Sequence, residues 1–170
     1  MVAIVLGVLG VEFLTAQQTV YLGIQEKLPL AVAAQPVPFS HRRHTASGMK
    51  CTDCHAKAQR EERAGIPAAG QCMLCHVAIR KDAAAVKRVA QFAAEKKAIP
   101  WVRVYRLPDF VFFSHASHTN AAVECQACHG SVAERDVLQK EVSTSMRTCV
   151  DCHRARKATL DCSRCHELGQ

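Results

Sequence analysis

The chain has few of the side chains that build an ordinary protein interior. Its 170 residues include nine aromatics (one Trp, two Tyr and six Phe), and long aliphatic runs are scarce beyond the N-terminal segment. A domain of this length normally buries a sizeable apolar core, so a conventional core would be thin here. A bound group would have to supply the missing apolar volume.

The sequence also has no cysteine outside one repeated pattern. All ten cysteines fall into five Cys-x-x-Cys pairs, and a histidine follows each pair directly. We number them motif 1 (Cys51, Cys54, His55), motif 2 (Cys72, Cys75, His76), motif 3 (Cys125, Cys128, His129), motif 4 (Cys149, Cys152, His153) and motif 5 (Cys162, Cys165, His166). None is left for a disulfide framework. Zinc and iron-sulfur sites have no reason to place a histidine after every pair.

This pattern is typical of covalent haem attachment. Two cysteines three positions apart form thioethers to the two vinyl groups of one porphyrin, and the adjacent histidine falls under the iron. We expect five covalently bound haem c groups, whose porphyrins replace the missing core. The polypeptide without haem should not fold properly. Because bacteria attach haem outside the cytoplasmic membrane, this part of the chain should be periplasmic.

One stretch occurs twice, 74 positions apart and without a gap. The residues Phe39, Ser40, His41, His44, Thr45 and motif 1 match Phe113, Ser114, His115, His118, Thr119 and motif 3. An internal repeat of this kind indicates two copies of one supersecondary unit.

Four histidines stand outside the motifs, and they are His41, His44, His115 and His118. Their placement in two identical His-x-x-His units favours a role as distal iron ligands, so four haems are expected to have two histidine ligands. The fifth needs another ligand. We predict Met146, three residues before Cys149, which would raise the reduction potential of that haem. A packing role for Met146, with an open fifth iron, is the alternative.

The N-terminal residues 1–24 are almost wholly apolar. As a helix they would be about 36 Å long, enough to cross a bilayer core of about 30 Å, and we predict a transmembrane anchor. Two alternatives are a signal peptide cleaved at the small residues 31–33 and an interfacial helix whose Glu12 reaches the headgroups. No basic residue precedes the apolar run, which disfavours the signal peptide. A Glu12 that faces protein implies membrane partners.

The remaining chain divides into a Pro-rich linker (25–38), a two-haem module (39–81), a helical connector (82–99) and a three-haem module (100–170). Within these segments we expect a helix from Asp82, its N-cap, to about Lys97, with Pro100 ending it. It either docks the modules together or simply covers the haem cluster. We also expect a short charged helix over 59–64, an extended segment over 101–106 and a short helix within 130–141.

Phe-Ser-His-x-x-His followed by Cys-x-x-Cys-His resembles the class III cytochromes c, the cytochrome c3 and c7 group. Across residues 35–170 the chain is similar to the pentahaem cytochrome subunit of alternative complex III, a bacterial quinol:cytochrome c oxidoreductase. The phrases that carry this narrower resemblance are Gln35-Pro-Val-Pro-Phe-Ser-His41, Ala64-Gly-Ile-Pro67, Cys72-Met-Leu-Cys-His76, Pro100-Trp-Val-Arg-Val-Tyr-Arg-Leu-Pro-Asp-Phe110 and Thr144-Ser-Met146.

The resemblance to c7 implies which ligand serves which haem. There the first histidine of His-x-x-His serves the haem just downstream and the second serves the next. Carried over, His115 serves motif 3, His118 motif 4 and Met146 motif 5. By the same pattern, His41 serves motif 1 and His44 motif 2, although the first module lacks a third motif.

The expected fold is therefore mainly α and coil, c3/c7-like, with short helices wrapped around five haems and an N-terminal transmembrane helix. The resemblance implies an electron relay in a membrane complex, with an iron-sulfur subunit as donor and a soluble cytochrome c or an oxidase as acceptor. The relay itself would perform no substrate chemistry. Two alternatives are a subunit of another periplasmic oxidoreductase of the molybdopterin type and a haem reductase with an open site at haem 5.

The formal charge of +7 does not indicate a nucleic-acid partner. Each ferric haem with two histidine ligands and two ionised propionates carries a formal charge of −1, so five haems offset most of the excess. Much of the Lys and Arg content is expected to neutralise propionates.

Overall fold

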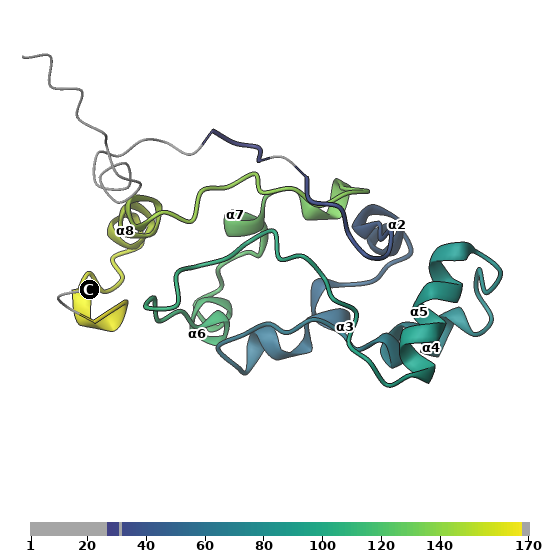
Figure 1. The fold of residues 1–170 in the computed structure, drawn as a ribbon. Coiled ribbons are helices and arrows are strands. Elements are labelled where there is room, and N and C mark those ends of the chain that lie inside the picture. The colour runs from purple at the N-terminus through teal and green to yellow at the C-terminus, as the bar shows by residue number, and fades with distance from the viewer. Residues whose placement is uncertain (1–26, 31, 168–170) are drawn as a thin grey trace, which may run out of the picture.

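The structure, a computed structural model, describes residues 27–30 and 32–167. Short helices joined by coil make up this part of the chain (Figure 1). They are α2 (His41–Ala46), α3 (Cys51–Cys54), η1 (Ala56–Gln59), α4 (Ala69–His76), α5 (Ala84–Ala94), α6 (His115–Asn120), α7 (Gln126–His129), η2 (Val132–Glu134), α8 (Met146–Ala155) and η3 (Cys162–Arg164). The described residues form no β-strand, only an isolated antiparallel bridge between Val111 and His166. The prediction of a mainly helical and coil fold is confirmed.

The anchor predicted over residues 1–24 and the first residue of the alternative cleavage site at 31–33 lie outside the described residues. Within the described ranges, no helix is long and apolar enough to cross a membrane. The described part of the predicted linker contains no helix before α2 begins at His41.

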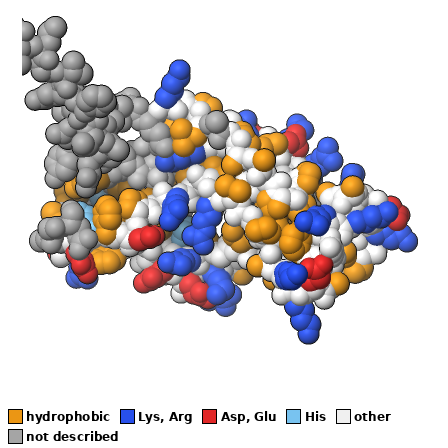
Figure 2. All heavy atoms as spheres, in the orientation of Figure 1, with side chains coloured by type: hydrophobic (Ala, Val, Ile, Leu, Met, Phe, Trp, Pro, Cys, Tyr) orange, Lys and Arg blue, Asp and Glu red, His pale blue; other side chains and the backbone are white. Residues whose placement is uncertain are grey.

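The buried core is small, as the composition predicts. The buried residues of the described chain are Val37, Ala69, Val86, Val89 and Ile99. Four of them, Val37, Ala69, Val89 and Ile99, form one cluster where α4 packs against α5, with Phe92 and Trp101 partly buried against it. None of the described residues from 100 to 167 is buried. Apolar side chains lie open at the surface instead (Figure 2), and Leu74 next to Cys75 is 79% exposed.

The end of the predicted linker is part of this core. Val37 is the most buried residue described, at 2% exposure. The side-chain amide of Gln35 pairs with both backbone groups of Val102 at 3.0 Å, which joins the linker to the start of the second module. The linker is therefore packed into the domain before α2 begins.

The two copies of the repeat have the same local structure. A serine caps each His-x-x-His helix, because Ser40 Oγ accepts from Arg43 N–H in α2 and Ser114 Oγ accepts from Ser117 N–H in α6. Such caps satisfy backbone donors that have no partner within the helix. The phrase that recurs in the sequence therefore specifies two matching helical turns.

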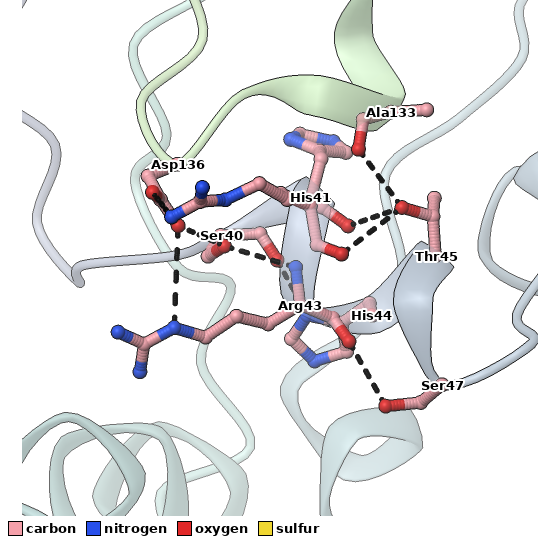
Figure 3. A network of polar contacts seen from close by, with 9 residues as sticks. Ser40, His41, Arg43, His44, Thr45, Ser47, Ala133 and Asp136 are labelled. Carbon is pink, nitrogen blue, oxygen red and sulfur yellow. Dashed lines mark hydrogen bonds and ion pairs between the residues drawn. The ribbon is translucent and has the colours of Figure 1, made fainter.

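Each copy also packs against the His-x-x-His helix of the other copy. Helix α6 packs against η1 of the first copy, and α2 packs against η2 of the second. Thr119 Oγ1 lies 3.0 Å from the Ala58 carbonyl oxygen, and its counterpart Thr45 Oγ1 lies 2.9 Å from that of Ala133 (Figure 3). Each module therefore braces the His-x-x-His helix of the other.

The connector helix differs from its prediction at both ends. The N-cap of α5 is Ala83, which has no side-chain oxygen, so the prediction of Asp82 as the cap is wrong. The helix ends at Ala94, before Pro100, because Lys96 adopts a left-handed φ of 52°. Lys97 N–H then bonds Phe92 O and Lys96 N–H bonds Ala93 O, a Schellman ending made without glycine. Val89 and Phe92 of α5 pack in the core that α5 forms with α4, and Val86 is also buried.

The prediction of a charged helix over 59–64 is wrong. The chain forms the 3-10 helix η1 and then bends, since the carbonyls of Glu61 and Glu62 accept the first N–H groups of α6 from Ala116 at 3.1 Å and His115 at 3.0 Å. A tertiary contact thus replaces the local helix. The helix expected within 130–141 is the short η2. Residues 101–106, expected to be extended, contain no helix but bend at Val104 and Tyr105.

Candidate haem-binding sites

Each motif lies on a short helical turn, which places its two thiols where they can attach to the same planar group. Motif 1 occupies α3, motif 2 ends α4, motif 3 spans the start and length of α7, motif 4 lies in α8 and motif 5 begins with η3. Residues three apart on a helix lie on one side of it. All ten thiols are free and either half-buried or exposed, so each remains available for a thioether.

Three of the predicted distal histidines face the proximal histidines to which the c7-like pattern assigns them. The ring centres are 6.1 Å apart for His44 and His76, 6.3 Å for His115 and His129, and 6.0 Å for His118 and His153. The corresponding interplanar angles are 70°, 9° and 40°.

These separations suit a metal ion held between two imidazoles. A metal–imidazole nitrogen bond is about 2 Å long, and the ring centre lies roughly 1 Å behind that nitrogen, so two axial rings have centres about 6 Å apart. The observed separations of 6.0, 6.1 and 6.3 Å match this value. The three pairs are therefore spaced to take one iron each.

Backbone carbonyls accept a hydrogen bond from Nδ1 of most of the predicted proximal and distal histidines, and so orient their rings. The acceptors at 2.7–3.0 Å are Ser40 O for His44, Gly65 O for His55, Ile79 O for His76, Glu62 O for His115, Ser114 O for His118, Thr159 O for His153 and Glu167 O for His166. A hydrogen on Nδ1 leaves the Nε2 lone pair free, which is the arrangement of metal-binding histidines. The donor set therefore fits iron as well as the spacing does.

His41 is the exception among the distal histidines. Its Nδ1 is buried and has no hydrogen-bond partner among the described residues, whereas its counterpart His115 donates to Glu62 O at 2.8 Å. Burial lowers the pKa of the His41 imidazole, and His55 and His44 nearby lower it further. His55 is the predicted proximal histidine of motif 1, and the assignment of His41 to that motif stays a prediction. The His41 and His44 rings leave α2 in different directions (Figure 3).

In each His-x-x-His unit, the ring of the preceding phenylalanine contacts both histidine rings. The Phe39 ring stacks on His44 at 4.5 Å and meets His41 edge-on at 4.8 Å. Phe113 repeats this arrangement, with 4.5 Å to His118 and 4.9 Å to His115. The repeated Phe therefore orients two distal rings toward two different motifs.

Asp136 supports the start of α2 from the second module. Ser40 Oγ donates to its carboxylate at 2.6 Å, and the Arg42 guanidinium pairs with it. These groups lower the pKa of Asp136, with the Ser40 hydrogen bond as the largest cause. Glu62 holds the matching position in the other copy and contributes its backbone carbonyl instead.

Tyr105 is a supporting residue that the sequence reasoning did not identify. Its hydroxyl donates to His129 O at 3.1 Å and accepts from Glu141 N–H at 2.9 Å, and its ring meets the His129 ring edge-on at 4.7 Å. The Glu141 carboxylate in turn accepts from Ser131 N–H at 3.1 Å and pairs with Arg135. These contacts hold the segment that follows motif 3. The only feature of the sequence that points to Tyr105 is its position in the phrase from Pro100 to Phe110.

Motif 5 lies beside motif 4 at the C-terminal side of the described chain. Phe112 N–H donates to Cys165 O at 2.7 Å, and a cavity is lined by His118, His153 and Cys165 among others. Met146 is the first residue of α8, one turn before Cys149, and is 67% exposed. It therefore has little packing role in the polypeptide, and its ligation of the fifth iron stays a prediction.

Thiols of different motifs lie close enough to affect one another. Burial raises the pKa of several of them, and in each case a thiol of another motif raises it further. The pairs are Cys72 with Cys54, Cys125 with Cys51, Cys128 with Cys152, and Cys149 with Cys128 and Cys165. The attachment sites therefore form one connected cluster.

Comparison with known proteins gives two family matches, one in each half of the chain. A model described as cytochrome c3 matches residues 43–102, and a model described as cytochrome c7 and related cytochrome c matches residues 111–167. The chain is 28% identical over 144 residues to a protein of Nitratidesulfovibrio vulgaris named menaquinone reductase, multiheme cytochrome c subunit. That alignment covers 78% of this chain and 67% of the relative.

Proposed function

Because both halves of the chain are c3/c7-like multihaem cytochrome c domains, we propose that it is a relay subunit with five haems in a membrane complex that exchanges electrons with quinone. Bound haem iron cycles between its ferric and ferrous states, one electron at a time. The observation that carries the proposal is the opposed imidazole pairs, such as His115 and His129 at 6.3 Å. Two histidines on each of four irons leave those irons no position for a substrate.

We propose the following roles for the residues of the motifs. The cysteines of motifs 1 to 5 hold the porphyrins, and the histidine of each motif binds iron from the proximal side. On the distal side we propose His41, His44, His115 and His118 for motifs 1 to 4 in that order, and Met146 for motif 5. We also propose an anchor in residues 1–24 that keeps the haem domain at the periplasmic face of the cytoplasmic membrane.

Two complexes fit this relay, and they differ in the direction of electron flow. The phrases around residues 35–41 and 100–110 favour a quinol-oxidising alternative complex III, with an iron-sulfur subunit as donor and a soluble cytochrome c or an oxidase as acceptor. The Nitratidesulfovibrio relative is named for menaquinone reduction, which favours electron flow toward quinone. Both give this chain the same role between a membrane subunit and a periplasmic redox partner.

The test is purification of the intact complex from native membranes. The pyridine haemochrome of this subunit should give five haems per chain, and the ferric spectrum should be low-spin throughout. Fewer haems would disprove the relay as stated, and a high-spin haem would support a reductase with an open iron at motif 5. Co-purified subunits distinguish a quinone-reactive complex from a molybdopterin oxidoreductase. Reduction of the haems by added quinol, or their oxidation by added quinone, then decides the direction.

A further inference from the structure

The two His-x-x-His helices each connect two motifs. On α2, His44 faces His76 of motif 2. The c7-like pattern assigns His41, on the same helix, to motif 1. The side-chain amide of Gln71, next to motif 2, donates to the Asp53 carbonyl inside motif 1 at 2.7 Å. Motifs 1 and 2 are therefore direct neighbours.

Helix α6 connects motifs 3 and 4 in the same way. Its His115 faces His129 of motif 3, and its His118 faces His153 of motif 4. Only three positions separate the two distal histidines along the helix. Motifs 3 and 4 are therefore neighbours, as their counterparts 1 and 2 are.

The two halves meet through motifs 1 and 3. A cavity of about 120 Å³ is lined by Cys51 of motif 1 together with Cys125 and His129 of motif 3. Cys51 and Cys125 are equivalent positions of the repeat, so two equivalent parts of the modules face each other. The exchanged contacts of α2 with η2 and of α6 with η1 hold this junction together. Figure 1 shows α3, which carries motif 1, between α7 and α4, which carries motif 2.

Motif 5 extends the series beyond motif 4. The cavity lined by His118 and His153, the predicted ligands at motif 4, is also lined by Cys165 of motif 5. The bridge between Val111 and His166 and the bond from Phe112 N–H to Cys165 O fix motif 5 beside the start of the second His-x-x-His unit.

From these contacts, and on the basis of the proposed function, we propose that the motifs form a single file in the order 2, 1, 3, 4, 5. Figure 1 shows the helices that carry them in this sequence across the molecule, from α4 through α3, α7 and α8 to the C-terminal segment. Motif 2 and motif 5 are the two ends at which electrons enter and leave. The junction of motifs 1 and 3 is the one crossing between the modules, so every electron that passes between the ends uses it.

The order is tested with two variants on one helix, His41→Met and His44→Met, in the haem-loaded full chain. A thioether in place of an imidazole raises the potential of the haem at that site, so this haem is reduced before the adjoining haems that keep two histidine ligands. Its added electron lowers the potential of adjoining haems by charge repulsion, which falls with distance. Haem methyl resonances followed by NMR during a redox titration report each haem separately.

We expect His41→Met to lower the potentials at two other motifs, 2 and 3, and His44→Met to do so mainly at motif 1. An order that follows the chain would give the reverse, with motif 3 responding to His44→Met more than to His41→Met, and that result overturns the proposal. If a variant loses its haem, iron positions in a structure of the unmodified haem-loaded chain decide the question. There the iron of motif 3 must lie nearer to that of motif 1 than to that of motif 2. A chain without covalent haem would instead disprove the proposed function.

Discussion

The Thr119 hydroxyl lies 3.0 Å from the backbone carbonyl oxygen of Ala58, a residue 61 positions earlier in the chain. Thr45, the equivalent threonine of the first copy, reaches Ala133 in the second copy at 2.9 Å. Each hydroxyl also lies 3.1 Å from carbonyls of its own helix. The threonines of the repeated phrase therefore join the distal-histidine helix of one module to the segment after the first haem motif of the other.

Removal of either hydroxyl should weaken the junction between the modules. We expect Thr119→Val and Thr45→Val each to lower the free energy of unfolding by about 1 kcal/mol, since one hydrogen bond to a backbone carbonyl is lost while the shape is kept. Denaturant unfolding of the haem-loaded chain, followed by Soret absorbance, measures this.

The matched control for the threonines is Ser47→Ala, because the Ser47 hydroxyl bonds only Arg43 O of the same helix, at 2.9 Å, among the contacts described. It should leave the stability nearly unchanged. An equal loss in the control and in the threonine variants would show that the contact between modules contributes nothing specific.

Replacement of Met146 should affect one haem and little else. Because Met146 is 67% exposed, Met146→Leu removes almost no packing. If the thioether binds the fifth iron, the variant loses the haem of highest potential from a redox titration, and a high-spin ferric signal appears. Met49→Leu is the control, since Met49 is half-buried and lies outside the predicted ligand set. An unchanged titration in Met146→Leu would show that another group, or none, completes that site.

The angles between paired imidazoles predict distinct spectra. The rings of His115 and His129 are nearly parallel at 9°, whereas those of His44 and His76 are steeply inclined at 70°. Parallel axial rings give a rhombic low-spin ferric EPR signal, and steeply inclined rings give a highly axial one. We expect both types in the oxidised protein, and His44→Met should remove highly axial intensity without loss of the rhombic signal. The opposite loss would contradict the pairing of His44 with His76.

Gly130, directly after motif 3, should not tolerate a side chain. Its φ is +70°, and a Cβ there would lie 2.6 Å from Glu141 Oε2 and 2.9 Å from Glu141 Cβ. We expect Gly130→Ala to cost about 1–3 kcal/mol of stability through backbone strain and displacement of Glu141. Gly70→Ala in α4 is the control, since a Cβ there meets nothing within 4 Å and a helical Gly-to-Ala change should stabilise by about 0.5–1 kcal/mol. Equal unfolding midpoints for the two variants would contradict this.

Glu141 should make the segment after motif 3 sensitive to acid. Arg135 and the Ser131 N–H hold the pKa of its carboxyl below the ordinary value of 4.5. Since the folded state then binds this proton less readily than the unfolded state, the stabilisation is present above pH 4.5 and is lost as pH falls through the lower folded-state pKa.

Unfolding measured across this acid range tests the Glu141 contribution. We expect Glu141→Gln to be less stable than the parent chain at neutral pH and to lose less stability on acidification. Glu134→Gln, which changes an exposed carboxylate on the neighbouring η2, is the comparison. Parallel pH profiles for Glu141→Gln and the parent chain would show that this carboxyl does not carry the effect.

The sequence by itself determined the chemistry of this protein and its repeated parts. The five Cys-x-x-Cys-His motifs, the two His-x-x-His units and the scarcity of core residues are local or compositional features, and so are the serine caps of α2 and α6. Each depends on residues a few positions apart, whose spacing on a helical turn follows from helix geometry. The thin core could also be predicted, because it follows from composition alone.

The tertiary structure alone decided how these parts fit together. The carbonyls of Glu61 and Glu62 accept hydrogen bonds from α6 rather than from a local helix. Lys96 ends α5 in a left-handed conformation, although the sequence has no glycine there to indicate it. Each copy of the repeat packs against the other, and Tyr105 contacts His129. These contacts, and the proposed spatial order of the motifs, depend on residues that lie far apart in the chain. Such contacts depend on which backbone groups meet after folding, and no local spacing encodes that.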